Sequence, residues 1–155
     1  MFGSDTLDSL FVLWAFAFQG VLIAHFALRK WAFDSALRYG WVVYALGVPA
    51  AVLSILLLLN GKQWALWLGG FLCLVWSLLG FTVEYVRHIN WRDPLRWSIF
   101  VPYVALYLAT ILFYWFPLAL ISRPLWYIYA VLFAVSTLLN VTSHTPSRRP
   151  VQHPL

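Results

Sequence analysis

Charge is what this 155-residue chain has least of, because Asp, Glu, Lys and Arg together make up only 10% of it. Soluble domains carry about 25% charged and about 45–50% apolar residues, whereas 63% of this chain is hydrophobic. A single soluble core of this length could not bury that much apolar surface. The composition therefore excludes a soluble globular domain and predicts a membrane protein.

The absent charges define five long stretches without a single Asp, Glu, Lys or Arg. These stretches cover residues 9–28, 39–61, 63–83, 97–122 and 124–147. Each is long enough for a membrane-spanning helix, which needs about 20 apolar residues. We expect an all-α fold, in which residues 1–141 form one bundle of five transmembrane helices. The fifth span is expected to end near residue 141, and 142–155 to form a disordered cytoplasmic tail.

Cysteine is nearly absent as well. The single Cys73 lies within the third stretch, which rules out a disulfide within the chain. The segment before the first stretch is acidic, through Asp5 and Asp8, whereas a cleaved secretory signal begins with basic residues. We therefore expect the first stretch to be a permanent span.

Proline, glycine and tryptophan mark features of the predicted helices. Pro49 removes a backbone donor and predicts a kink in the second span, and Asn60-Gly61 predicts the end of that span. Tryptophans near the span ends predict an aromatic belt at headgroup level. They are Trp31, Trp41, Trp64, Trp67, Trp91, Trp97 and Trp126.

Basic residues gather in the connectors on one side of the predicted bundle. If the N-terminus lies outside, the outer connectors hold only Lys62 and Arg123. The inner connectors and the tail then hold Arg29, Lys30, Arg38, Arg87, Arg92, Arg96, Arg148 and Arg149. Short cytoplasmic loops are enriched in Lys and Arg. We therefore predict an N-terminus outside and a C-terminus inside, most simply in a bacterial-type inner (cytoplasmic) membrane.

The net charge of +5 is thus spread over loops beside the membrane. Anionic lipid of the inner leaflet is the expected partner of such loops, and nucleic acid is not. The residues expected to contact this lipid are Arg29, Lys30, Arg38, Arg87, Arg92 and Arg96.

The fourth span carries a stripe of hydroxyl groups. Tyr103, Tyr107, Thr110 and Tyr114 are spaced four, three and four residues apart, so they share one helix face. Hydroxyls exposed to hydrocarbon would be unsatisfied, so this face is expected to point into the bundle. Two interpretations remain open: hydrogen bonds between helices, or a pocket for a largely apolar ligand, to which Gln19 and His25 of the first span would contribute.

Small residues line one face of three spans and predict close helix packing. They are Ala17, Gly20, Ala24 and Ala27 in the first span, Gly40, Gly47, Ala51 and Ser54 in the second, and Gly69, Cys73, Ser77 and Gly80 in the third. These faces could pack within the chain, or against a second copy or other membrane proteins.

Ionisable groups are scarce inside the spans, where they would mark pumps and catalytic sites. His25 is the only imidazole well within a span. Glu84, Arg87 and His88 have the i, i+3, i+4 spacing of one helix face, and we expect an interfacial polar cluster there; a metal site lacks a third ligand. The sequence argues against an enzyme and against a metal site, and it leaves any cofactor unidentified.

One segment resembles a known family. Val-Pro-Tyr-Val-Ala-Leu-Tyr at 101–107 resembles the proline-tyrosine segment of the tryptophan-rich sensory (translocator) protein family. That segment lies on the fifth span of the family and on the fourth span here, and the family's other tryptophan-proline segments are absent. The resemblance implies small-ligand binding and is limited to these residues.

We therefore expect a non-catalytic integral membrane protein that binds a lipid or other apolar small molecule within its helix bundle. One alternative is an accessory or scaffold subunit of a larger membrane complex. A second alternative is a small transporter or channel-like protein.

Overall fold

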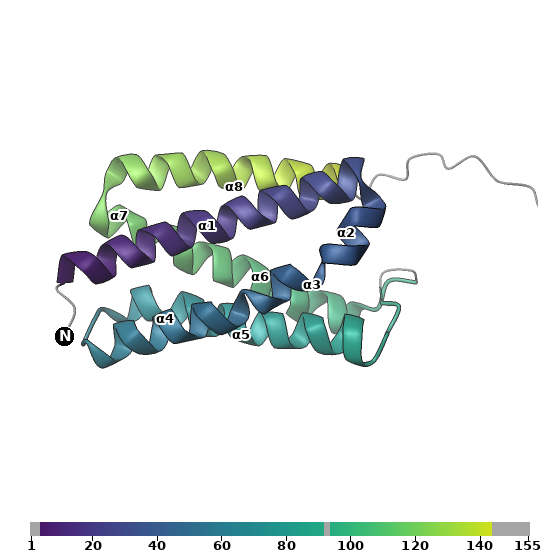
Figure 1. Cartoon of the computed structure of the whole chain (residues 1–155), viewed down its shortest axis with the longest axis horizontal. Helices are drawn as coiled ribbons and strands as arrows, with labels where there is room; N and C mark the ends of the chain where they lie inside the picture. The colour runs from purple at the N-terminus through teal and green to yellow at the C-terminus, as the bar shows by residue number, and fades with distance from the viewer. Residues whose placement is uncertain (1–3, 92–93, 144–155) are drawn as a thin grey trace, which may run out of the picture.

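The computed structural model describes residues 4–91 and 94–143 (Figure 1). Every regular element within these residues is a helix. Five helical segments are long and apolar enough to cross a membrane: Thr6–Trp31, Phe33–Leu59, Trp64–Val86, Trp97–Ile121 and Arg123–Ser143. The prediction of an all-helical protein with five helices of membrane-spanning length is thus confirmed.

Three of the five segments are built from more than one element. The first and the fifth are single helices, α1 (Ser4–Trp31) and α8 (Arg123–Ser143). The second consists of α2 (Phe33–Tyr39), α3 (Trp41–Ala45) and α4 (Gly47–Leu59). The third is α5 (Trp64–Phe81) followed by one π-helical turn, Thr82–Val86. The fourth is α6 (Trp97–Trp115) followed by the short α7 (Leu118–Ile121).

The helices run back and forth between two ends of the bundle. In Figure 1, α1 and α8 lie side by side in one layer, α4 and α5 form the opposite layer, and α6 lies between them. The start of α1, the connector between α4 and α5, and α7 gather at one end. At the other end lie α2, the segment after the π-helical turn, and the last turn of α8.

The predicted connector at 29–38 is largely helical. Helix α1 continues through Arg29 and Lys30, which lie in its last turn, where cations interact favourably with the helix dipole. Helix α2 then begins after a single intervening residue and buries Ala36 against the bundle. This end of the molecule therefore carries an additional short helix, and α2 covers part of the space between the two layers.

The second span bends near its proline. The helix is interrupted at Leu46, one turn before Pro49, where α3 gives way to α4. Proline has no N–H, so the carbonyl one turn earlier loses its usual donor. The Leu46 N–H still donates to the Val42 carbonyl at 3.3 Å, and the Ala50 N–H to the Leu46 carbonyl at 3.1 Å. The break thus redirects the helix without separating its two parts.

The second span ends at Asn60-Gly61, as predicted. The Gly61 N–H donates to the Leu58 carbonyl and the Lys62 N–H to the Leu57 carbonyl, both at 3.0 Å. Gly61 has a φ of 66°, in the left-handed region that glycine tolerates best. This pattern of bonds is the common glycine-terminated helix end, and it turns the chain directly into α5.

Glycines set the distance between α4, α5 and α6. A Cβ atom on Gly47 would lie 2.7 Å from the Ser77 Cβ, and one on Gly70 would clash with Ser54 and the backbone of Ala50. A Cβ on Gly69 would lie 3.1 Å from the Phe113 carbonyl oxygen of α6. The small faces of the second and third spans are therefore used inside the chain, as the interhelical packing of small residues in membranes predicts.

Candidate functional site

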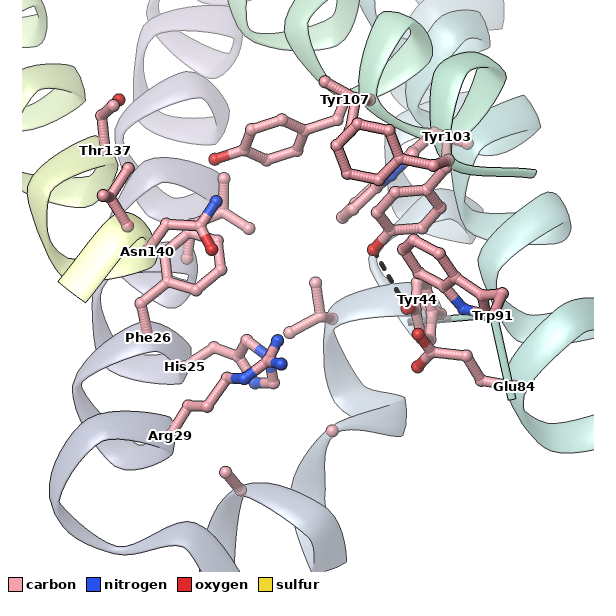
Figure 2. A pocket seen from close by; sticks show the side chains of 18 of the residues that line it. His25, Phe26, Arg29, Tyr44, Glu84, Trp91, Tyr103, Tyr107, Thr137 and Asn140 are labelled. Carbon is pink, nitrogen blue, oxygen red and sulfur yellow. Dashed lines mark hydrogen bonds between the residues drawn. The ribbon is translucent and has the colours of Figure 1, made fainter. Parts of the chain in front are cut away.

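A cavity of about 520 Å³ lies between the two helix layers, at the end that carries α2 (Figure 2). Its walls come from α1, α2, α3, the end of α5 with its π-helical turn, α6 and α8. Pockets for small molecules usually measure about 300–1,000 Å³ and are mostly apolar with a few polar groups. Size and composition both fit that class of site.

The part of the cavity nearest the middle of the bundle is apolar. Leu22 and Phe26 of α1, Trp76 of α5 and Phe133 of α8 line it. Leu22, Phe26 and Trp76 are buried, with exposed fractions of 1%, 7% and 2%. These residues offer a wall that suits hydrocarbon or an aromatic ring.

Polar side chains line the part nearer the helix ends. Figure 2 shows His25 and Arg29 of α1 on one side, and Tyr44, Glu84 and Trp91 on the opposite side. Asn140 and Thr137 of α8 complete this part of the lining. The cavity therefore has an apolar inner part and a charged outer part.

Tyr44 occupies its position because Gly80 has no side chain. A Cβ on Gly80 would overlap the Tyr44 ring, so only glycine lets α3 place this ring against α5. The Tyr44 and Tyr103 hydroxyls are 3.1 Å apart and form a hydrogen bond. This bond joins the second and fourth spans across the cavity wall.

Tyr107 points its hydroxyl into the cavity (Figure 2). Its side chain is only 8% exposed; its hydroxyl makes no hydrogen bond of regular geometry among the described residues, although the Ser136 hydroxyl is close enough to interact with it. A buried hydroxyl left unpaired costs about 1–3 kcal/mol. A ligand that accepts or donates a hydrogen bond at this point would remove that cost.

The predicted hydroxyl stripe divides into two halves. Tyr103 and Tyr107 line the cavity, whereas Thr110 and Tyr114 are buried farther along α6. The Thr110 hydroxyl donates to the Leu106 carbonyl at 2.8 Å, within its own helix. Trp14 Nε1 donates to the Tyr114 hydroxyl at 2.9 Å and ties α1 to α6. Only the first half of the stripe is therefore placed to meet a ligand.

The two polar residues predicted on the first span also separate. His25 lines the cavity, but Gln19 lies in the α1–α8 interface. Its amide nitrogen donates to the Ser136 hydroxyl at 2.7 Å and to the Leu132 carbonyl at 3.2 Å. Gln19 thus holds two helices together and does not reach the cavity.

The turn that carries Glu84 is π-helical, so the α-helical spacing used to predict a face shared with Arg87 and His88 does not apply there. The α-helix gives way to the π-helical turn at Thr82, and the Arg87 N–H donates to the Thr82 carbonyl at 2.8 Å, five residues back. The wider turn changes the angular spacing, and His88 then adopts a φ of 49° outside the helix. Glu84 consequently lines the cavity, while Arg87 and His88 are exposed beside it. No group of three metal-ligating side chains comes together in residues 4–91 and 94–143.

Several lining residues were missed from the sequence. Trp91 was assigned to the aromatic belt, yet it is 5% exposed and its ring lies 5.1 Å from that of Tyr103. Arg29 was assigned to the lipid surface, although its spacing of four from His25 places both on one helix face. Tyr44 and Asn140 gave no periodic signal. Among the predicted lipid contacts, Arg92 lies outside the described residues, and so does the part of the predicted tail beyond residue 143.

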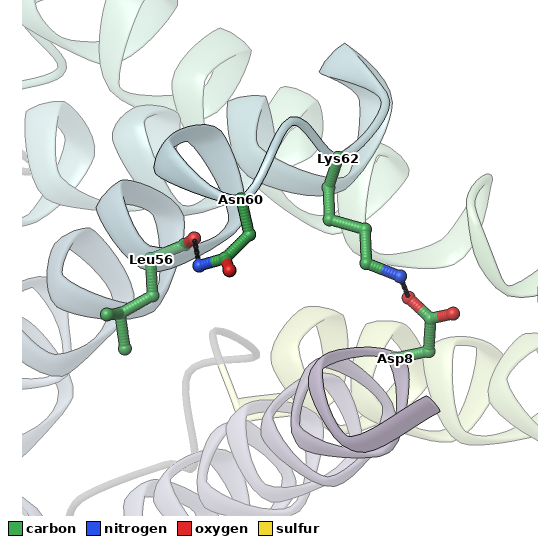
Figure 3. Close-up of polar contacts among 4 residues, drawn as sticks. All are labelled: Asp8, Leu56, Asn60 and Lys62. Carbon is green, nitrogen blue, oxygen red and sulfur yellow. Dashed lines mark hydrogen bonds and ion pairs between the residues drawn. The ribbon is translucent and has the colours of Figure 1, made fainter. Parts of the chain in front are cut away.

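The opposite end of the bundle is organised differently (Figure 3). Lys62 Nζ lies 2.6 Å from Asp8 Oδ1, an ion pair that joins the first turns of α1 to the α4–α5 connector. The Asn60 amide donates to the Leu56 carbonyl at 2.8 Å in the same connector. Asp8 and Lys62 thus neutralise each other at this end, and a more open, largely apolar hollow beside them is lined by Asp8, Ser9, Val12, Leu13, Phe16, Leu120, Ile121 and Leu125.

Known proteins offer no guide to this site: no family model matches the chain, and no curated protein or solved structure is significantly similar to it.

Proposed function

We propose that this protein is a non-catalytic integral membrane protein that binds a lipid or other largely apolar small molecule in the cavity. The observation that carries the proposal is the cavity of about 520 Å³ with an aromatic and aliphatic inner wall and the buried Tyr107 hydroxyl that faces it.

The distribution of charge supports an orientation with the cavity on the cytoplasmic side of a bacterial-type inner membrane. Arg29, Lys30 and Arg38 lie at the α2 end, as do Arg87 and Arg96. Lys62 and Arg123 are the basic residues described at the opposite end. By the positive-inside rule, the α2 end is cytoplasmic, the N-terminus is outside, and a ligand enters from the inner leaflet. Anionic lipid then surrounds these basic side chains.

Filling the cavity tests the proposal. Val104 of α6 lines the cavity, whereas Val101, three residues earlier, is 54% exposed on the outer surface. The full-length protein, purified in mild detergent, is analysed by native mass spectrometry for retained small molecules. We expect a bound amphiphile in the unmodified protein and in Val101→Trp, and its loss in Val104→Trp. Equal retention in both variants, or no retained molecule in any of them, would refute ligand binding in this cavity.

A role as an accessory subunit is the second candidate, and one observation favours it. The small face of α1 is exposed at Ala17, Gly20 and Ala24, and a Cβ on Gly20 would meet nothing within 4 Å. Exposed small faces let a second membrane helix approach closely. If this face binds a partner or a second copy, Gly20→Ile abolishes co-purification of that partner, while Val131→Ile on the exposed surface of α8 does not. An unchanged monomer in all three proteins would rule this role out.

A further inference from the structure

The two sides of the outer cavity carry opposite charges. Arg29 and His25 project from α1 on one side, and Glu84 projects from the π-helical turn on the other (Figure 2). Charged groups of a ligand are favoured beside side chains of the opposite charge. A ligand whose polar end carries one negative and one positive group would meet both sides at once, whereas an anion or a cation alone would be repelled by one of them.

Aromatic rings line the side of the cavity that carries Glu84, which we call the acidic side. The Tyr103 ring lies 5.1 Å from that of Trp91 and 5.7 Å from that of Trp76. Tyr44 lies 5.7 Å from Trp76 and 6.0 Å from Tyr85. All five rings line the cavity: Tyr44, Trp91 and Tyr103 lie on the side of Glu84 (Figure 2), and Trp76 extends the aromatic wall toward the apolar inner part. Aromatic faces attract ammonium groups, and clustered aromatic side chains are the usual receptors for them.

The side of the cavity that carries Arg29 and His25, the basic side, offers hydrogen-bond donors instead of aromatic rings. Arg29 presents a planar guanidinium whose donors match the oxygens of phosphate and carboxylate, and the His25 imidazole lies one helical turn deeper on the same face of α1. Asn140 of α8 adds an amide that can donate to the same group. This side therefore suits an anionic group, and the acidic side suits an amine.

We propose that the cavity selects amphiphiles with a zwitterionic polar end, namely a phosphate held by Arg29 and His25 and an ammonium group held by Glu84 among the aromatic rings. The acyl chain lies along Leu22, Phe26 and Phe133, and Tyr107 meets the polar linkage between the two parts. The inference rests on the proposed function and specifies the class of ligand for the same cavity. Glycerophospholipids with an amine headgroup have this chemistry.

The experiment compares lipids that share their acyl chains. Full-length protein in detergent, stripped of co-purified lipid, is titrated with short-chain phosphatidylethanolamine, phosphatidylglycerol and diacylglycerol, and binding is measured by native mass spectrometry. We expect phosphatidylethanolamine to bind at least about tenfold more tightly than the other two, since one hydrogen-bonded charge pair contributes about that factor. Glycerophosphoethanolamine, which lacks acyl chains, is expected to bind at least about tenfold more weakly than the lipid with the same headgroup.

Two variants test the contributions of Glu84 and Arg29 one at a time. Glu84→Gln is expected to lower the affinity for phosphatidylethanolamine about tenfold and to leave phosphatidylglycerol unchanged or tighter. Arg29→Gln is expected to weaken both phospholipids and to leave diacylglycerol unchanged. Asp34→Asn, which removes an exposed charge at the same end, serves as the matched control for Glu84→Gln and should change no affinity.

The outcomes distinguish this inference from the proposed function. If all three lipids bind equally and Val104→Trp abolishes their binding, the zwitterion inference is overturned and the cavity remains a binding site. A preference for phosphatidylglycerol, or an effect of Glu84→Gln no larger than that of Asp34→Asn, overturns it as well. If no lipid binds, both fail together.

Discussion

The buried tyrosines differ chiefly in what their hydroxyl groups contact. The Tyr114 hydroxyl accepts a hydrogen bond from Trp14. The hydroxyls of Tyr107 and Tyr129 are buried without a hydrogen bond of regular geometry among the described residues, but only Tyr107 lines the cavity. A hydroxyl in an existing bond stabilises the fold, whereas one that faces a cavity is available to a ligand.

Removing these hydroxyls one at a time should separate the two roles. Tyr114→Phe is expected to lower the free energy of unfolding by about 0.5–1.5 kcal/mol, because the indole donor of Trp14 loses its acceptor. Tyr107→Phe should leave the free energy of unfolding unchanged or higher, and should weaken ligand retention. Unfolding in mixed micelles and native mass spectrometry measure the two quantities.

Tyr129→Phe is the matched control for the loss of an unpaired buried hydroxyl outside the cavity. It should resemble Tyr107→Phe in stability and the unmodified protein in ligand retention. A loss of stability in Tyr107→Phe equal to that of Tyr114→Phe would show that Tyr107 has a structural partner.

Among the helices, close approach depends on glycines that face a neighbouring backbone. Gly70 of α5 leaves no room for a side chain, because Ser54 and the backbone of Ala50 lie against it. Gly20 of α1 is the opposite case, since nothing lies within 4 Å of its Cβ position. The same residue type thus has a packing role in one helix and none within the chain in the other.

Alanine at these two positions should act in opposite directions. Gly70→Ala is expected to destabilise the protein by about 1–3 kcal/mol, the usual range for overpacking, because α4 must move away from α5. Gly20→Ala should leave the stability unchanged or raise it by about 0.5–1 kcal/mol through helix propensity. Thermal unfolding of the detergent-solubilised protein provides the comparison. A destabilised Gly20→Ala would indicate a partner on the outer face of α1.

The elements could be predicted from the sequence to the extent that they depend on local composition. Charge-free stretches located the five spans, and Asn60-Gly61 located one helix end, because hydropathy and glycine conformation are local properties. The π-helical turn at Thr82–Val86 carries no such signal. The α-helical spacing assumed for Glu84, Arg87 and His88 therefore does not hold there; Glu84 lines the cavity, while Arg87 and His88 are exposed.

The cavity could be predicted only in part for a related reason. Periodicity shows which residues share a helix face, so Tyr103 and Tyr107 were found together with His25. It does not show where a neighbouring helix ends or bends. Thr110 and Tyr114 share the face of Tyr107 but do not line the cavity, since the Thr110 hydroxyl bonds within α6 and that of Tyr114 meets Trp14 of α1. Tyr44 enters the site through the packing of α3 on Gly80.

For the whole molecule, the orientation in the membrane is a prediction that single cysteines test. Gln63 and Asn90 are exposed and lie at opposite ends, and Cys73 is fully buried, with an exposed fraction of 0%. In intact bacterial cells, a membrane-impermeant maleimide should label Gln63→Cys. It should label Asn90→Cys only after the membrane is opened. The reverse pattern would place the cavity on the outer side and contradict the positive-inside assignment.

A deletion within the π-helical turn could change which ligand a related sequence binds. Turns of this kind contain one residue more than an α-helical turn and are frequent at functional sites. Deleting one residue between Thr82 and Val86 would restore regular α-helix and rotate the following side chains by about 100°. The five spans and their packing upstream would remain, but the wall that now carries Glu84 would change its chemistry. A single-codon deletion could therefore give a protein with the same architecture and a different choice of ligand.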